Sequence, residues 1–390
     1  MEFCRWPAGA GIAAVTLAAS LALAPVPVLA AAPLKIGVPV PLSGSSANAG
    51  IDIVNAAKLA AAAINAKGGV MGRQIQIVPE DDACDAQTAV QAAQKMIDSG
   101  VVAVAGGYCS GAALPELSTL HRHNIPYVLD ASTNPQLTEM GYKDVFRTIG
   151  RDDEQGPFVA NFMVNSLHAK RVAVINDNTT YAKGLADSTV ASLKKLGAKV
   201  VYNNAITPGQ LNYQPVLTHV AALKPDVIYY TGYFSEAGLL VKEARQLHLK
   251  ATFMGGDGTQ DPTLIKTAGK AAEGMLISTA PLPQFLSGAK GFVDEYTKKY
   301  GHGPGPYSAY EYDAVSILAQ AIGNAKSTKP GAIDAALAKI KNYPGITGNI
   351  SFNAKGDRAV AVYIIITVKN GKFAPYQRLT AAGKWVAMKQ

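Results

Sequence analysis

The fold is decided by residues 101–133, VVAVAGGYCSGAALPELSTLHRHNIPYVLDAST. The β-branched run Val101–Ala105 predicts a strand, the apolar spacing over Ala112–His123 predicts a helix, and Pro126–Leu129 predicts a second strand. A strand, a helix and a strand in this order form a right-handed unit with parallel strands. The loop Asp130–Thr133 therefore leaves the carboxyl end of a parallel strand, which is the edge where open α/β sheets bind ligands.

The same alternation extends in both directions and restarts after about Gly150, so we expect two α/β lobes, each a mostly parallel sheet flanked by helices. Further strands are predicted at Lys35–Val40, Gln74–Val78, Arg171–Ile175, Lys199–Tyr202, Asp226–Tyr230 and Ala251–Met254. Further helices are predicted at Asp52–Asn65, Gln87–Asp98, Glu154–Leu167, Tyr181–Leu196, Asn212–Leu223, Ser235–Leu247, Gly291–Lys299 and Tyr307–Ala325.

Length and composition agree with two lobes. The chain has 390 residues, of which 48% are apolar and 16% charged, so it is long enough to bury a core in each lobe. The formal charge is +8, from 36 Lys and Arg against 28 Asp and Glu. The basic residues are scattered singly or in pairs, which argues against a nucleic-acid-binding arm.

Residues 1–30 are predicted to be a signal peptide. Arg5 opens a short polar start, and Gly11–Ala24 follows without a charged residue. That run is shorter than the ~20 apolar residues that span a bilayer, and small residues near Ala30 and Ala31 fit a cleavage site. A retained N-terminal anchor is the alternative. With no cysteine at the cleavage point to carry a lipid, we expect export to a periplasm.

Cysteine usage supports this compartment. Cys4 leaves with the signal peptide, so the exported chain keeps Cys84 and Cys109. An even pair in an oxidising compartment predicts a disulfide. A bridged cysteine cannot act as a nucleophile, which weighs against a catalytic cysteine.

Four loops at predicted strand ends carry candidate ligand-binding residues. Ser110 lies at a predicted helix N-cap with its hydroxyl and amide available, and Thr133 follows the next strand. Tyr233 follows the strand that ends at Tyr230, and Asp257 lies between glycines after the strand that ends at Met254. Each has a plain structural alternative, since Ser and Thr often cap helices and Asp often forms turns.

Signatures of an enzyme are missing from the sequence. No G-x-G-x-x-G opens a helix after the first strand, and there is no Walker A loop and no G-x-S-x-G elbow. His121 and His123 have no second pair at metal-ligand spacing and lie at a predicted helix end. The acidic stretch Glu80–Asp85 lacks the spacing of an EF-hand and is interpreted as a solvated loop beside the disulfide. We therefore expect no metal, no cofactor and no catalysis.

Several motifs together resemble the branched-chain amino-acid binding proteins, the leucine/isoleucine/valine-binding family of type I periplasmic binding proteins. The resemblance covers nearly the whole exported chain. Its carriers are Ile64–Gly69, Asp81–Asp85, Cys109–Ser110, Arg147–Thr148 with Asp153–Pro157, Tyr181 with Gly184–Leu185, Tyr229–Tyr233, Phe253–Gly255 and Ala272–Gly274.

The resemblance implies a two-lobed fold with three hinge crossings and a ligand between the lobes. The crossings are expected near Arg151, near Pro281 and in the segment Asp357–Ile364. The first lobe would then comprise residues 31–151 and 281–358, and the second lobe residues 152–280 and 359–390.

The resemblance also implies a role for each candidate. Ser110 with its neighbouring amides, and Thr133, would take a ligand carboxylate from the first lobe, while the carbonyl of Ala131 accepts from an α-ammonium. Asp257 matches the acid that pairs with the ammonium from the second lobe, and Tyr181 and Tyr233 would close over the ligand. An acid at this position favours a ligand with an amine, because a buried charge needs a partner.

Three positions depart from the leucine-type pattern. Ala49 stands where such members carry an aromatic residue in the first loop, Tyr108 replaces an aliphatic residue, and Tyr307 is the later aromatic. These departures indicate a side chain other than leucine, larger or more polar. The expected function is capture of an α-amino acid by a monomer that delivers it to a membrane ABC permease. The alternative is a binder or sensor of an amide, a urea or an aromatic carboxylate.

Overall fold

A computed structural model describes residues 1–4 and 31–388. Most of the predicted signal peptide, residues 1–30, lies outside the described residues. The chain divides into two units, Met1–Ala31 and Ala32–Gln390, and every helix and strand named below belongs to the second. Within the described residues, no helix combines the length and apolar character that a membrane span requires.

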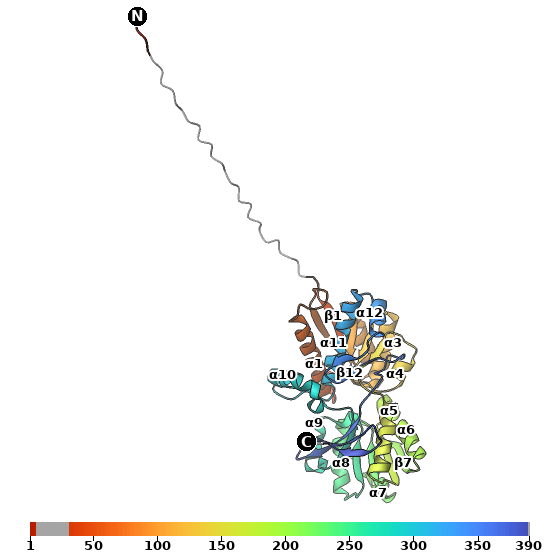
Figure 1. Cartoon of the computed structure of the whole chain (residues 1–390). Helices are drawn as coiled ribbons and strands as arrows, with labels where there is room; N and C mark the ends of the chain where they lie inside the picture. Colours follow the sequence, from red (N-terminus) through yellow and green to blue (C-terminus); the bar gives the residue numbers. More distant parts are fainter. Residues whose placement is uncertain (5–30, 389–390) are drawn as a thin grey trace. The chain divides into compact units, whose positions relative to one another are not determined.

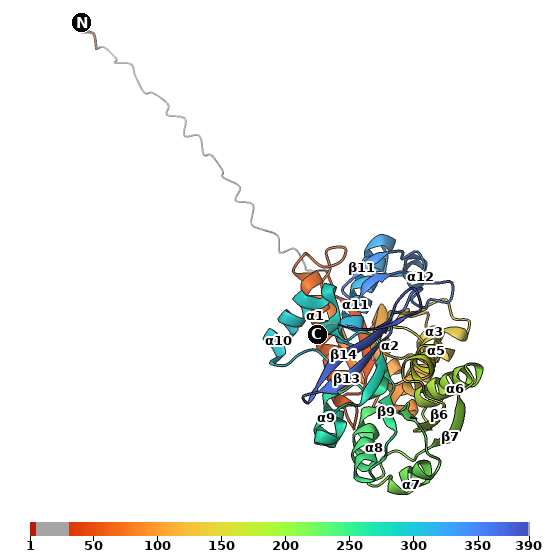
Figure 2. The same ribbon diagram turned by 60° about the horizontal axis from the view of Figure 1, so that its bottom comes forward.

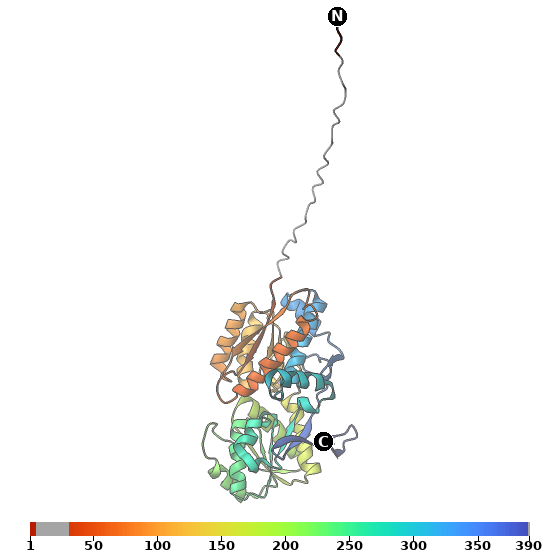
Figure 3. The same ribbon diagram turned by 90° about the vertical axis from the view of Figure 1, so that its left-hand side faces the viewer.

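The first sheet has five parallel strands in the order β2-β1-β3-β4-β5. Their bounds are Leu34–Val40 for β1, Ile75–Asp81 for β2, Ala103–Gly106 for β3, Tyr127–Leu129 for β4 and Val145–Arg147 for β5. Figure 3 shows this sheet with helices on both of its sides.

Seven helices and a hairpin belong with this sheet and form, with it, what we call the first lobe. The helices are α1 (Ala47–Asn65), α2 (Ala86–Ser99), α3 (Ser110–Arg122), α4 (Gln136–Glu139), α10 (Lys290–Tyr300), α11 (Ser308–Ala325) and α12 (Pro330–Leu337). The hairpin strands are β11 (Tyr343–Gly345) and β12 (Gly348–Ile350).

The second sheet has eight strands in the order β15-β14-β13-β10-β9-β8-β6-β7. The parallel part contains β6 (Arg171–Asn176), β7 (Lys199–Ala205), β8 (Val227–Tyr230), β9 (Thr252–Gly255) and β10 (Leu276–Thr279). The antiparallel edge contains β13 (Ile364–Lys369), β14 (Lys372–Leu379) and β15 (Trp385–Ala387), and Figure 2 shows β13 and β14 side by side.

Helices α5 to α9 flank this sheet and complete the second lobe (Figure 1). They are α5 (Asp152–Asn161), α6 (Thr180–Lys195), α7 (Gln214–Ala222), α8 (Phe234–Gln246) and α9 (Pro262–Ala268). Helix α5 continues into a π-helical turn, Phe162–Ser166.

The central parallel strands of both sheets are covered on both faces, as parallel sheets require, whereas no residue of β14 or β15 at the antiparallel edge is buried. Because successive side chains of a strand point to opposite faces, Val172 and Val174 of β6 join the core under α5 and α6, whereas Ala173 and Ile175 join the core under α8. This arrangement leaves only the ends of the strands open to a ligand.

The chain passes between the two sheets three times. It does so between β5 and β6, between β10 and α11, and between β12 and β13. The hydroxyl of Tyr363 donates to the carbonyl of Arg151 at 2.8 Å, and the hydroxyl of Tyr310 donates to the carbonyl of Pro281 at 3.0 Å. The fold prediction of two α/β lobes with three crossings is confirmed, while the lobe bounds 31–151 with 281–358 and 152–280 with 359–390 stay a prediction.

Some local predictions need correction. Helix α1 begins at Ala47 instead of Asp52, so Ala49 lies in the first turn of a helix and is buried. The structure adds elements that the sequence analysis did not identify, namely α4, α9, α12, β5, β10, the hairpin strands β11 and β12, and the strands β13 to β15. The C-terminal strands pair along the sheet edge, and β13 turns into β14 through Asn370-Gly371, a two-residue turn with positive φ at both residues that the sequence analysis did not use.

Candidate functional site

The loops that follow β3 and β4 lie side by side, because these strands are parallel neighbours. The hydroxyl of Ser132 donates to the carbonyl of Gly107 at 2.7 Å, and the amide of Asn134 donates to Ser110 Oγ at 3.3 Å. Ser110 is 1% exposed and Thr133 is 3% exposed. The structure therefore brings the two predicted hydroxyl residues together at one edge of the first sheet.

Helix α3 points its N-terminus at this edge. Ser110 is its first residue and Cys109 occupies the N-cap position, which corrects the prediction that Ser110 is the cap. The backbone reaches this position through Gly107, whose φ is +94° and whose Cβ, if it had one, would lie 2.5 Å from the hydroxyl of Tyr127. The first amides of a helix have no intrahelical acceptor and carry its positive dipole end, so they favour an anion.

A buried arginine holds the loop that carries Thr133. Arg147 is fully buried, and its Nη1 donates to the carbonyls of Ser132 and Asn134 at 3.0 Å each. Its Nε pairs with Asp357 Oδ1 at 3.0 Å, and the other oxygen of Asp357 lies 2.7 Å from Arg151 Nη1. Asp357 comes from the third crossing, so residues distant in sequence fix the conformation of this loop.

Ala131 lies in the same loop and is 5% exposed. Its carbonyl accepts no loop or side-chain hydrogen bond from the part of the chain that the structure describes. The carbonyl is thus free to accept a proton donor, as its predicted role requires.

The second lobe places its candidates at the ends of β6, β8 and β9. The hydroxyl of Tyr181, in the first turn of α6, donates to Asp257 Oδ1 at 2.7 Å and accepts from the amide of Gly258 at 2.8 Å. Asp257 begins a short 3₁₀ helix and is 2% exposed. The amide of Tyr233 donates to Asp177 Oδ2 at 3.4 Å. The buried carboxylates of Asp177 and Asp257 and two tyrosines thus share one edge of the second sheet.

Residues of the first lobe reach this carboxylate. The hydroxyl of Tyr307, at the start of α11, donates to Asp257 Oδ2 at 3.1 Å. The ring of Tyr108 lies 5.6 Å from that of Tyr307 and 5.7 Å from that of Tyr233, between centroids. The rings of Tyr181 and Tyr233 are 5.1 Å apart. Four tyrosines from the two lobes therefore surround Asp257.

Burial dominates the electrostatics of this carboxylate. It raises the pKa of Asp257, and the hydroxyls of Tyr181 and Tyr307 act in the opposite direction by donating to the ionised form. No cation of the described chain pairs with Asp257. A buried carboxylate without a cation is suited to receive one from a ligand.

Sequence reasoning missed residues near the first turns of α5. Asp152 is fully buried, and its amide donates to the carbonyl of Thr133 at 3.1 Å. Burial raises the pKa of Asp152, and the negative charge of Asp257 raises it further. Gln155 Nε2 donates to the carbonyl of Ser278 at 2.9 Å. The motif Asp153–Pro157 belongs to the family resemblance, but the placement of this helix start beside Thr133 depends on the first crossing.

Asn134 was also missed. Its Nδ2 donates to the carbonyl of Thr180 at 2.8 Å, which links the first lobe directly to the start of α6. A Cβ on Gly184 would lie 2.5 Å from this Nδ2 atom, so a small residue is needed at position 184 for the contact.

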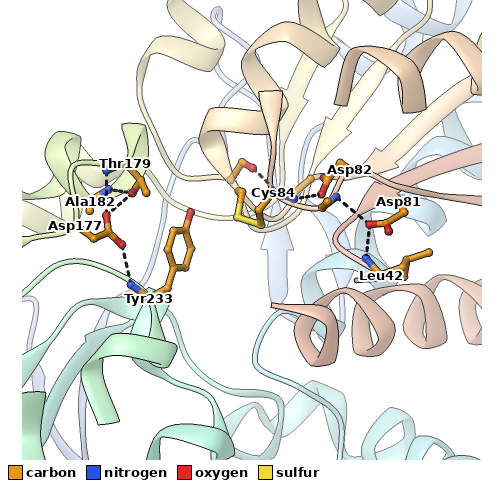
Figure 4. Close-up of a disulfide and its surroundings, with 12 residues drawn as sticks. Leu42, Asp81, Asp82, Cys84, Asp177, Thr179, Ala182 and Tyr233 are labelled. Carbon is orange, nitrogen blue, oxygen red and sulfur yellow. Dashed lines mark hydrogen bonds between the residues drawn. A yellow bond between two sulfur atoms is a disulfide. The ribbon is translucent and has the colours of Figure 1, made fainter. Parts of the chain in front are cut away.

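A pocket of about 410 Å³ opens beside Tyr233. Its walls come from both lobes: Cys84, Cys109 and Asp85 on one side, and Asp177 and Tyr233 on the other. Figure 4 shows the ring of Tyr233 extending from its loop toward the side of the disulfide, with Asp177 holding the amide at its base.

The predicted disulfide is confirmed, since Cys84 and Cys109 are bridged with their Cα atoms 5.3 Å apart. The interpretation of Glu80–Asp85 as a solvated loop is wrong. Glu80 and Asp81 belong to β2, and Asp82 is fully buried, with its Oδ1 accepting from the amide of Cys84 at 2.8 Å. The strand continues further than predicted because it pairs with β1 as far as Asp81.

The two histidines that the sequence analysis weighed as a metal pair, His121 and His123, lie at the end of α3. His121 Nδ1 lies 2.9 Å from Asp144 Oδ2, and its ring stacks on Tyr142 with centroids 3.8 Å apart. His123 is the C-cap of α3. In residues 1–4 and 31–388, no three His, Cys, Asp or Glu side chains are grouped so as to hold a metal ion.

The chain is similar in sequence to proteins named as amino-acid-binding proteins. An amino acid binding protein of Pseudomonas aeruginosa is 35% identical over 83% of this chain and 87% of its own length. The Leu/Ile/Val-binding protein of Escherichia coli K12 is 33% identical over 81% of this chain and 85% of its own. Both relatives align along nearly their whole length.

Solved structures agree with these relatives. A leucine binding protein of Thermotoga maritima superimposes with a TM-score of 0.82 at 32% identity, covering 88% of this chain and 97% of that one. A branched-chain amino acid transporter substrate binding protein of Streptococcus pneumoniae, in complex with isoleucine, gives 0.81 at 31% identity over 87% and 97%. The family model described as periplasmic binding protein matches residues 33–372. The chain therefore belongs to the periplasmic binding protein family, with the type I fold, and is a substrate-binding protein rather than an enzyme.

Proposed function

We propose that the protein captures an α-amino acid between its two lobes. In this proposal the hydroxyls of Ser110 and Thr133 and the first amides of α3 bind the ligand carboxylate. The carbonyl of Ala131 and the carboxylate of Asp257 bind the ammonium, and Tyr181, Tyr233, Tyr108 and Tyr307 enclose it. Partners for both ends are needed, because each unpaired buried charge costs several kcal/mol.

The observation that carries the proposal is the setting of Asp257. It is 2% exposed, accepts hydrogen bonds from Tyr181 and Tyr307, and has no cationic partner in the described chain. On the other lobe, the first amides of α3 and the hydroxyls of Ser110 and Thr133 supply hydrogen-bond donors for an anion. The combination is complementary to a zwitterion, and the isoleucine complex of the Streptococcus pneumoniae relative supports an amino acid as the ligand.

The same relatives support a role in transport. We propose that the mature protein lies in the periplasm after removal of residues 1–30, acts as a monomer without binding nucleic acid, and presents its ligand to a membrane ABC permease. Hinge motion at the three crossings would let ligand contacts from the second lobe drive closure, since a ligand shifts a conformational equilibrium only through its differential contacts.

The ligand can be identified from the purified protein. Small molecules released on denaturation are identified by mass spectrometry, and calorimetry then compares each candidate with its deaminated and amidated analogues. We expect an α-amino acid, with much weaker binding when either charged end is removed. Preference for an amide, a urea or an aromatic carboxylate over every amino acid would contradict the proposal.

A further inference from the structure

Two acidic side chains that the proposed ligand site does not use are buried at the end of β4 and the start of α11. Asp130 follows β4 directly, and Glu311 lies in the first turn of α11. Both are 0% exposed, and none of their four carboxyl oxygens has a hydrogen-bond partner among residues 1–4 and 31–388. Buried polar groups in native proteins normally have partners, so two that lack them call for an explanation.

The backbone brings these two side chains together. The hydroxyl of Thr148 donates to the carbonyl of Leu129 at 3.2 Å and to the carbonyl of Tyr310 at 3.1 Å. The next residues along the chain are Asp130 and Glu311, so a single hydroxyl ties both backbone positions together. Burial raises the pKa of each carboxyl group, and the negative charge of Asp130 raises the pKa of Glu311 further. The two groups therefore act on one another as a pair.

No side chain of the described residues supplies a positive charge to this pair. Neither Asp130 nor Glu311 takes part in a salt bridge there. The buried arginines are bonded to other groups, Arg147 to Asp357 and Arg358 to backbone carbonyls. Two carboxylates cannot both stay ionised in such a setting, because an uncompensated buried charge is strongly unfavourable. The other titratable side chains that act on this region are acids as well, namely Asp82, Glu116 and Tyr127.

We propose that Asp130 and Glu311 share one proton at neutral pH, so that a carboxyl–carboxylate hydrogen bond joins the end of β4 to the first turn of α11. Two carboxyl groups held close together keep a proton between them, because like charges at short distance cannot both form. Ala131 follows Asp130 directly, and Tyr307 lies one helical turn before Glu311. The shared proton thus fastens together the two elements that carry these residues, whatever ligand the protein binds.

The pH dependence of stability detects the shared proton. Urea unfolding of the ligand-free mature protein at pH 5.5, 6.5 and 7.5 compares the wild type with Asp130→Asn/Glu311→Gln, whose two amides keep the shape of the pair and cannot ionise. The folded wild type keeps a proton that the unfolded chain releases near pH 4. Its unfolding equilibrium constant, divided by that of the variant, should therefore rise about tenfold per pH unit, or about 1.4 kcal/mol. Asp82 and Glu116 are present in both proteins, so their effects cancel in this ratio.

A matched control makes the same two changes at exposed positions of α10. For Asp294→Asn/Glu295→Gln the ratio to the wild type should not change with pH. If the amide pair does not fold, Asp130→Ala/Glu311→Ala also lacks both ionisable groups and should show the same tenfold slope. A ratio that stays constant with pH would mean that both carboxyl groups are ionised in the folded protein, and it would overturn the proposal. A hundredfold rise per pH unit would also overturn it, because each group would then hold a proton of its own.

Discussion

The pH dependence of ligand binding should come mainly from Asp257. Only its ionised form pairs with an ammonium, and burial raises its pKa above the ordinary value of 3.8. The carboxylate in the free protein therefore takes up a proton as the pH falls toward that raised pKa, and binding must then expel the proton. We predict that affinity for the amino acid, measured by calorimetry at a series of pH values from 7.5 downward, falls as the pH is lowered. An affinity that rises on acidification would contradict an ammonium at Asp257.

Asp82 should make stability depend on pH. Burial raises its pKa from 3.8 to about 7, and only one of its oxygens has a hydrogen-bond partner in the described chain. The folded protein retains the proton that the unfolded chain releases near pH 4, so this group lowers stability progressively as the pH rises from about 4 to about 7.

Asp82→Asn removes that loss. The free energy of unfolding of the variant should exceed that of the wild type by about 2–4 kcal/mol at pH 8 and by little at pH 4. Urea unfolding at the two pH values measures the difference. An equal effect at both would show that Asp82 titrates normally in the folded protein.

At the scale of elements, the loop after β4 depends on the third crossing. Asp357 lies between Arg147 and Arg151 and is 2% exposed. Asp357→Asn leaves two guanidinium groups without this anion, and removing one member of a buried ion pair typically costs about 3–5 kcal/mol. We predict that the free energy of unfolding, measured in urea, falls by that amount. Glu139→Gln, an exposed partner of Arg151, is the control and should cost less than about 1 kcal/mol.

The disulfide joins the turn after β2 to the N-cap of α3, beside Ser110. Its cysteines are 25 residues apart, and a loop of this size adds about 3 kcal/mol in the chain-entropy description. Replacing both cysteines by serine should lower the free energy of unfolding by about that amount. Reduction of the wild type should reproduce the loss, and no change in either case would show that the bridge contributes nothing to stability.

At the scale of the whole molecule, the sequence predicts the features that depend on local residue patterns. The strand and helix periods place Ser110, Thr133, Tyr233 and Asp257 at strand ends, because parallel strands present their carboxyl ends at one edge. The contact between Tyr307 and Asp257 joins two lobes across 50 positions of sequence, and no periodicity contains that information. The burial of Asp82 depends likewise on which helices cover the sheet.

The central claim is that the two lobes hold opposite ends of one zwitterion. The most direct measurement compares wild type and Asp257→Asn by calorimetry, using the amino acid recovered from the protein and its deaminated analogue. The claim predicts that the substitution weakens the amino acid by about a hundredfold or more and leaves the analogue unaffected or bound more tightly. Equal affinity of both proteins for the amino acid would contradict it.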